Sequence, residues 1–174
     1  MNFDLNKTIE ILERTPVVLE TLLKGISDDW TLGNEGVDTW SPYDIIGHLI
    51  HGEKTDWVAR VKVILEHGTR KPFTPWDRFA QYKESEGKTL QQLIDEFASI
   101  RKENLDWFKQ LNLTEADLDK RGMHPSLGEV TLRNLLSTWV VHDLTHIAQI
   151  SRVMAKQYKT EMGPWPQFFR ILDF

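Results

Sequence analysis

Residues 131–158 read TLRNLLSTWVVHDLTHIAQISRVMAKQY, and this stretch decides the fold. It predicts a helix with apolar side chains around most of its circumference, which is typical of a helix that packs against several neighbours. Thr131 is suited to cap the first turn, because a threonine hydroxyl can accept a hydrogen bond from a free amide there. We therefore expect a long helix that ends at about Tyr158 and is the most buried one of the chain.

Two helices are predicted in the first part of the chain by apolar side chains at helical spacing. The first spans residues 4–26, and Pro16 should kink or split it, because proline lacks the amide that the helix needs at that point. The second spans residues 41–65. Ser41 can cap it, and Pro42 stands at the first helical position, where a missing amide is harmless.

The remaining long helix is predicted to begin after Thr89 and to end at about Leu111. Thr89 and Gln92 have the spacing of a capping box, in which each side chain bonds to the backbone of the other residue. The preceding connection, residues 66–88, contains two glycines and two prolines and is expected to be irregular, with a short helical turn at residues 76–82.

The sequence thus predicts an all-α fold, a four-helix bundle with long crossover connections that forms a single domain over residues 1–174. The second crossover, residues 112–130, should contain a short helix after Thr114 and a turn at residues 124–128. The tail at residues 163–174 is expected to pack back onto the bundle. No stretch shows the alternating pattern of a β-strand, so we expect no strands.

Composition excludes several classes of function. The chain has 21 Lys and Arg against 26 Asp and Glu, a formal net charge of -5, which provides no basic surface for a nucleic acid. No apolar run is long enough to span a membrane, and the first residues do not resemble a secretory signal, so we expect no membrane partner and a cytoplasmic location. The chain has no cysteine, which excludes thiolate metal sites and cysteine nucleophiles. Any metal must be held by nitrogen and oxygen.

His142 and His146 are the residues that best indicate chemistry. They are four positions apart, so they lie on one face of the predicted helix, within its apolar stripe. Two buried imidazoles are costly to charge and need partners for their ring nitrogens, and a shared cation would supply one. The alternative is that both are core or surface histidines without a ligand, since this spacing also occurs by chance.

A third ligand should come from the helix at residues 41–65, where His48 and His51 are the candidates. We favour His48, because its line along the helix carries small residues that leave space for a ligand: Gly52, Thr55 and Ala59. His51 is expected to lie at the rim of the site.

The other polar candidates have ordinary explanations. His67 and His124 fall in connections, where solvated histidines are usual, although His124 could reach the mouth of a pocket. Glu53 and Arg60 are expected to be exposed helix charges. No residue is assigned a catalytic role from the sequence.

Three neutral imidazoles without a thiolate suit Zn²⁺, Ni²⁺, Fe²⁺ or Cu²⁺. Three protein ligands leave at least one position for water or a substrate, as catalytic metal sites do, whereas a structural zinc site would need a fourth ligand. The paired Glu-x-x-His motifs of di-iron bundles and the His-Glu-x-x-His motif of zinc proteases are absent from the sequence.

The sequence resembles the DinB-like (DinB/YfiT) family of metal-dependent enzymes over nearly the whole chain. Two segments carry the resemblance. The first is TWSPYD at residues 39–44, which leads to HLIHGE at residues 48–53. The second is WVVHDLTHIAQI at residues 139–150. The resemblance implies a four-helix bundle, often a homodimer, in which His48, His142 and His146 hold a divalent metal. Zn²⁺ and Ni²⁺ are the first choices, with Fe²⁺ as an alternative.

Characterised members of that family are thiol S-transferases and an isomerase that use low-molecular-weight thiols. The resemblance therefore implies a thiol-dependent S-transferase with a small-molecule substrate, in which the metal lowers the pKa of the thiol. Two alternatives stay open: a metal-dependent hydrolase that activates water, and a non-catalytic helical protein that binds a metal or small ligand.

Overall fold

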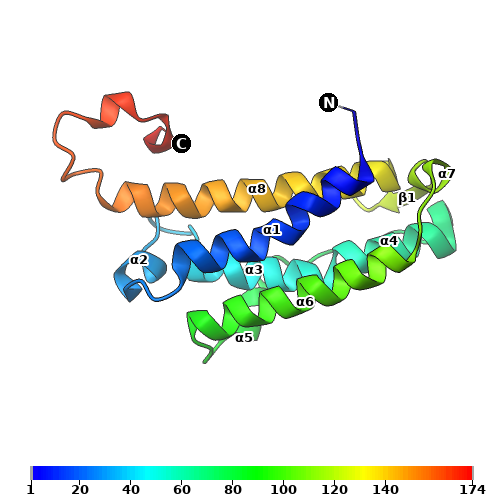
Figure 1. Ribbon diagram of the computed structural model, residues 1–174, viewed down its shortest axis with the longest axis horizontal. Helices are drawn as coiled ribbons and strands as arrows, with labels where there is room; N and C mark the ends of the chain where they lie inside the picture. Colours follow the sequence, from blue (N-terminus) through cyan, green and yellow to red (C-terminus); the bar gives the residue numbers. More distant parts are fainter. Residues whose placement is uncertain (1, 174) are drawn as a thin grey trace.

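Four helical columns run side by side along the molecule (Figure 1). The computed structural model describes residues 2–173, so the last residue of the tail, at position 174, lies outside the described part. The long helices are α1 Leu5–Leu23, α3 Pro42–Thr55 followed by α4 Trp57–His67, α6 Leu90–Gln110 and α8 Leu132–Gln157. The predicted four-helix bundle is confirmed. No helix within residues 2–173 has the length and apolar character needed to cross a membrane.

The crossovers carry the short elements. These are α2 Asp28–Leu32, η1 Gly68–Arg70, α5 Ala80–Ser85, α7 Glu115–Leu118, η2 Pro166–Phe168 and η3 Arg170–Leu172. The short helix predicted after Thr114 is therefore present as α7. The helical turn predicted at residues 76–82 lies further along the chain, as α5. In the tail, η3 packs against α8 through the buried Leu172.

The predicted caps are present. Ser41, Thr89 and Thr131 each accept a hydrogen bond from the amide of the third helical residue, whose side chain bonds back to the cap amide. Each of these boxes satisfies two backbone amides that would otherwise lack a partner at the helix start. The starts of α3, α6 and α8 are thus fixed by local chemistry.

One predicted helix is interrupted. The sequence predicts a continuous helix over residues 41–65, but the structure divides it at Asp56, whose backbone lies at φ -111° and ψ -75°. The Asp56 carboxylate is 7% exposed and pairs with Arg60 one turn later. No glycine or proline marks the break, so the sequence pattern does not reveal it.

A small hairpin corrects the prediction of no strands. β1 Arg121–His124 and β2 Gly128–Thr131 pair antiparallel, with Gly122 opposite Val130. Each strand has four residues, which is too short for an alternating pattern to stand out from the surrounding connection. The predicted turn at residues 124–128 is the tip of this hairpin.

Pro16 does not split α1, which is continuous from Leu5 to Leu23. A proline at position 16 cannot donate to the carbonyl of Leu12, four residues earlier. That carbonyl instead accepts a hydrogen bond of 2.8 Å from Nη1 of Arg101 on α6. The bond that the proline removes from the helix is thus replaced by a tertiary one.

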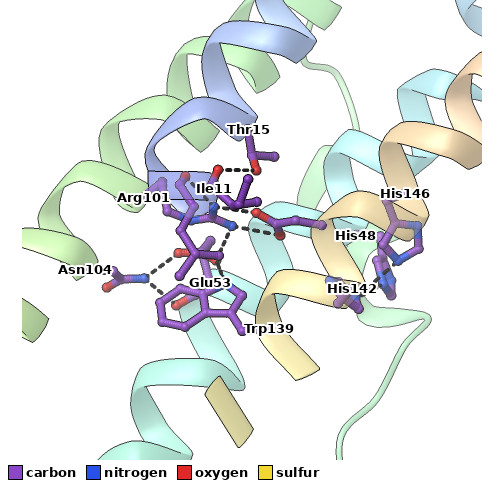
Figure 2. Close-up of polar contacts among 11 residues, drawn as sticks. Ile11, Thr15, His48, Glu53, Arg101, Asn104, Trp139, His142 and His146 are labelled. Atoms are coloured by element: carbon purple, nitrogen blue, oxygen red, sulfur yellow. Dashed lines mark hydrogen bonds and ion pairs between the residues drawn. The ribbon is translucent and has the colours of Figure 1, made fainter. Parts of the chain in front are cut away.

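Arg101 is the centre of a buried polar network (Figure 2). Its guanidinium is 1% exposed and donates to both oxygens of Asp143 on α8, at 2.6 and 3.1 Å, and to Glu53 on α3, at 2.9 Å. The Glu53 carboxylate also accepts hydrogen bonds from the Trp139 indole at 3.0 Å and the Asn104 amide at 2.9 Å. This network connects α1, α3, α6 and α8. It contradicts the expectation that Glu53 is an exposed helix charge.

The network lies between two apolar clusters of the core. Along α6, Phe97 belongs to one cluster and Leu105 to the other, with Arg101 halfway between them. Along α8, Asp143 likewise separates Trp139 from Ile150. The bundle therefore contains a polar layer across its middle.

Removing the guanidinium should destabilise the fold strongly. We expect Arg101→Met to lower the free energy of unfolding by about 3–5 kcal/mol, because it leaves the Glu53 and Asp143 carboxylates buried without a cation. Urea titration followed by circular dichroism measures the change.

The matched control is Lys102→Met on the next position of α6. Lys102 makes an exposed ion pair with Asp106, so we expect no measurable change in the urea midpoint. Equal midpoints for both variants would show that the network does not hold the bundle together.

Candidate metal centre

The structure brings His48, His142 and His146 together inside the bundle (Figure 2). Nε2 of His142 lies 3.1 Å from Nε2 of His48 and 3.2 Å from Nε2 of His146. One ring nitrogen from each histidine lies within 4.8 Å of the other two. His48 comes from the middle of α3, and the other two come from successive turns of α8, as the sequence spacing predicts.

Three tryptophans shield the cluster from water. Trp40 and Trp76 contact the His48 ring at centroid distances of 4.5 and 5.0 Å, and Trp57 contacts the His142 ring at 5.0 Å. His48 is 5% exposed as a result. The aromatic walls therefore exclude most solvent from the three imidazoles.

The small residues beside His48 make room for these tryptophans rather than for a ligand. A Cβ on Gly52 would lie 3.3 Å from the Trp57 indole nitrogen. Thr55 accepts a hydrogen bond of 2.9 Å from the Trp76 indole. The expectation that this line along α3 leaves space for a ligand is therefore wrong.

The environment keeps the three imidazoles neutral. Burial, followed by the neighbouring His146 and His142, lowers the pKa of His48 to about 2. Burial and His146 lower the pKa of His142 to about 3. The pKa of His146 is also lowered by burial, against the opposing effect of its hydrogen bond to Gln149. Neutral imidazole is the form that binds metals.

The hydrogen bond of His146 fits a ring that binds a cation through Nε2. Nδ1 of His146 lies 2.8 Å from Oε1 of Gln149, an acceptor, so the ring proton is on Nδ1 and the Nε2 lone pair is free. Nδ1 of His48 and of His142 is buried and has no hydrogen-bond partner. Nitrogens about 2.0–2.1 Å from a tetrahedral ion lie about 3.3–3.4 Å apart, close to the two short distances in the cluster. The three residues therefore fit a divalent metal.

His51 is buried, which contradicts its predicted place at the rim. It is 5% exposed, its Nδ1 lies 3.0 Å from Oε1 of Glu84, and its ring stacks on Trp76 at 5.4 Å. It does not belong to the cluster of candidate ligands. His51 instead supports the tryptophan that covers His48.

The structure also places the remaining candidates. The His67 side chain is 41% exposed at the end of α4, as expected for a solvated residue. His124 lines a cavity between the hairpin and α4, which agrees with the expectation that it could reach a pocket mouth. Arg60, expected to be exposed, has a side chain only 14% exposed because it pairs with Asp56.

Sequence reasoning missed the residues that hold the cluster in place. Arg101 and Asp143 were not considered as buried partners, nor was Gln149 as the acceptor for His146. A signal was available for Arg101, because it lies four positions from both Phe97 and Leu105 in the apolar stripe of its helix. A charged residue in such a stripe indicates a buried ion pair.

Comparison with known proteins identifies the family. A sequence model described as the DinB superfamily matches residues 11–150, which is most of the chain. The chain belongs to the DinB superfamily.

One solved structure illustrates the DinB fold in this chain. YfiT from Bacillus subtilis, described as a probable metal-dependent hydrolase with an unusual four-helix bundle topology, is 21% identical in sequence, and the match covers 90% of each chain with a TM-score of 0.76. At this level of identity the likeness shows the shared fold. No curated protein sequence matches the chain significantly.

The lowered pKa values predict how the stability of the metal-free protein depends on pH. Unfolded histidines take up protons near pH 6.5, while His48 and His142 in the folded state do so only near pH 2 and 3. Stability from these groups is therefore present above pH 6.5 and is lost as the pH falls toward the folded values. As the pH falls below 6.5, each of these two imidazoles lowers the free energy of unfolding by up to about 1.4 kcal/mol per pH unit.

Urea titrations with a chelator, at several values between about pH 7 and about pH 5, measure this dependence. We expect the fall in stability to be shallower in His48→Gln than in the natural chain, because glutamine does not titrate. His67→Gln, which changes an exposed histidine, should keep the original slope. An unchanged slope in His48→Gln would contradict the assignment of a neutral buried imidazole.

Proposed function

We propose that this DinB-superfamily protein is a divalent-metal-dependent enzyme in which His48, His142 and His146 hold the metal. The observation that carries the proposal is the approach of three neutral, largely buried ring nitrogens to distances of 3.1 and 3.2 Å without a residue between them. A single N–H···N hydrogen bond between neutral imidazoles accounts for only one of these two approaches, whereas the lone pairs of all three rings together bind a cation. Zn²⁺ and Ni²⁺ suit the three nitrogens best, with Fe²⁺ as an alternative.

The protein's own residues would prepare such a centre for chemistry. Gln149 fixes the orientation of the His146 ring, and the tryptophans fix His48 and His142 while excluding water. A bound divalent ion supplies Lewis acidity, which lowers the pKa of a thiol or water that reaches it. Three protein ligands leave room for such a small molecule.

We propose a thiol-dependent S-transferase as the reaction class, with a small-molecule substrate and a low-molecular-weight thiol. The resemblance of residues 39–53 and 139–150 to a family whose characterised members use thiols supports it. The chain has no cysteine of its own, so a sulfur nucleophile would have to come from a cosubstrate. The competing activity is metal-dependent hydrolysis, the activity given in the description of YfiT.

Turnover assays distinguish the two reactions. We expect the metal-loaded protein to convert an electrophilic substrate only when a low-molecular-weight thiol is present. Conversion without thiol, at the same rate, would favour the hydrolase. A metal-loaded protein with neither activity would favour a non-catalytic metal-binding role.

Metal analysis tests the site itself. We expect the protein, purified without a histidine tag, to contain about one metal ion per chain, and His48→Ala, His142→Ala and His146→Ala each to lose most of it, because two ligands hold a divalent ion far less well than three. Elemental analysis by mass spectrometry gives the stoichiometry.

The matched control is His67→Ala, which removes a histidine outside the cluster and should keep the metal. Circular dichroism of each variant separates loss of metal from loss of fold. Full occupancy in the three site variants would overturn the proposed site.

We further propose that the chain forms a homodimer, as the resemblance implies. Exposed apolar side chains on the adjacent helices α1 and α8 would be covered by a second copy; they include Val17, which is 62% exposed, and Val141, which is 61% exposed. Light scattering should give about twice the chain mass of 20.4 kDa, and Val141→Glu should reduce it toward one chain mass. A natural chain that scatters as a monomer would contradict the dimer.

A further inference from the structure

A cavity of about 600 Å³ lies beside the histidine cluster, between α4, the hairpin and α8. Trp57 and Trp76 line it, and their rings also contact His142 and His48. On α8, the cavity-lining residues Asn134 and Thr138 stand eight and four positions before His142, so they share its helix face. Trp57 and Trp76 thus lie between the cavity and the cluster.

The cavity walls are apolar and carry no net charge. Trp57, Trp76, Phe73 and Leu135 supply broad hydrocarbon surfaces. The charged residues among those that line it are Asp56 and Arg60, which form an ion pair with each other. His124, the other titratable group, has a pKa lowered by burial and by Arg60, so it is neutral. A charged ligand would find no unpaired opposite charge in this cavity.

The wall on the hairpin side is held in place by close packing. A Cβ on Gly122 would lie 2.7 Å from a side-chain carbon of Ile64 and 2.8 Å from the ring of Phe73, so only glycine lets the strand approach this closely. The amide of Phe73 donates a hydrogen bond of 2.9 Å to the carbonyl of Met123. The cavity is therefore preformed, as small-molecule sites usually are.

A second hollow, of about 630 Å³, has a different character. Residues of both signs line it: Glu35, Asp38, Arg78 and Arg152. Gln149, the partner of His146, also lines it. The cluster therefore has a mainly apolar cavity without net charge toward the start of α8 and a charged hollow toward its end.

We propose that the apolar cavity binds the uncharged, aryl or alkyl part of the molecule on which the metal centre acts. The inference rests on the proposed function, since the cluster supplies the chemistry, but binding in the cavity does not require the metal. It restricts the substrate class to small molecules with an apolar body and excludes those whose body is anionic.

Two fluorescent probes with one skeleton test the proposal: 1-anilinonaphthalene, which is uncharged, and 8-anilinonaphthalene-1-sulfonate, its anionic counterpart. We expect the uncharged probe to bind more tightly and Thr138→Trp to weaken its binding at least about tenfold, because the indole fills the cavity. Titration by probe fluorescence gives both affinities, with and without metal.

Thr21→Trp on α1 is the matched control. Both threonines are exposed on a helix and donate a hydrogen bond to the carbonyl four residues earlier, at 2.8 Å for Thr138 and 2.7 Å for Thr21. Thr21 does not line the cavity, so its variant should bind the probe like the natural chain. Leu127→Asp is a second variant. Leu127 lines the cavity at the hairpin tip and is 74% exposed, so we expect its substitution to leave the fold intact and to weaken binding of the uncharged probe about threefold.

Three results would overturn the proposal: equal affinity in Thr138→Trp and the natural chain, equal loss in Thr21→Trp, or binding of the sulfonate as tight as that of the uncharged probe. None of them depends on metal occupancy. A protein that binds the uncharged probe in the cavity but lacks metal would retain the cavity assignment and refute the metal centre, so the two failures are distinguishable.

Discussion

The burial of Arg101 is the constraint on which the rest of the structure depends. A guanidinium without water must find acceptors for its donors, and here these come from Asp143, Glu53 and the Leu12 carbonyl. Burial alone lowers the pKa of Arg101, but the two carboxylates raise it above its ordinary value, so it stays charged. Because each acceptor belongs to a different helix, the arrangement of the four columns must bring α1, α3 and α8 to the same side chain of α6.

This network also determines where the histidines lie. Asp143 follows His142 in the sequence. Binding of the Asp143 carboxylate by Arg101 therefore fixes the rotation of α8 about its axis and directs His142 toward α3. Counted formally, one guanidinium and two carboxylates leave one negative charge in the polar layer. At the imidazoles the charges of this network oppose one another, because Asp143 raises the pKa of His146 whereas Arg101 lowers the pKa of His142. The network thus supports the cluster through geometry.

The parts of this architecture that the sequence predicts are those governed by local physics. Some features depend only on residues that are close together in the sequence. They include the caps at Ser41 and Thr131 and the four-residue spacing of His142 and His146. The break at Asp56 and the hairpin at Gly122 depend on tertiary contacts with Arg60 and Phe73, which no periodic pattern encodes. Arg101 escaped prediction because an isolated helix charge is usually solvated; only its place in an apolar stripe indicates otherwise.

The two tryptophans between the cavity and the cluster, Trp57 and Trp76, differ in how firmly the fold holds them. Trp57 is 4% exposed within a helix and separates His142 from the apolar cavity, so it is a fixed wall. Trp76 belongs to a connection without helix or strand and is joined to α3 by an indole bond to Thr55. A side chain on such a segment is displaced at lower cost than one in a packed helix. Of the two tryptophans between the cavity and the cluster, Trp76 is therefore the one that moves at lower cost.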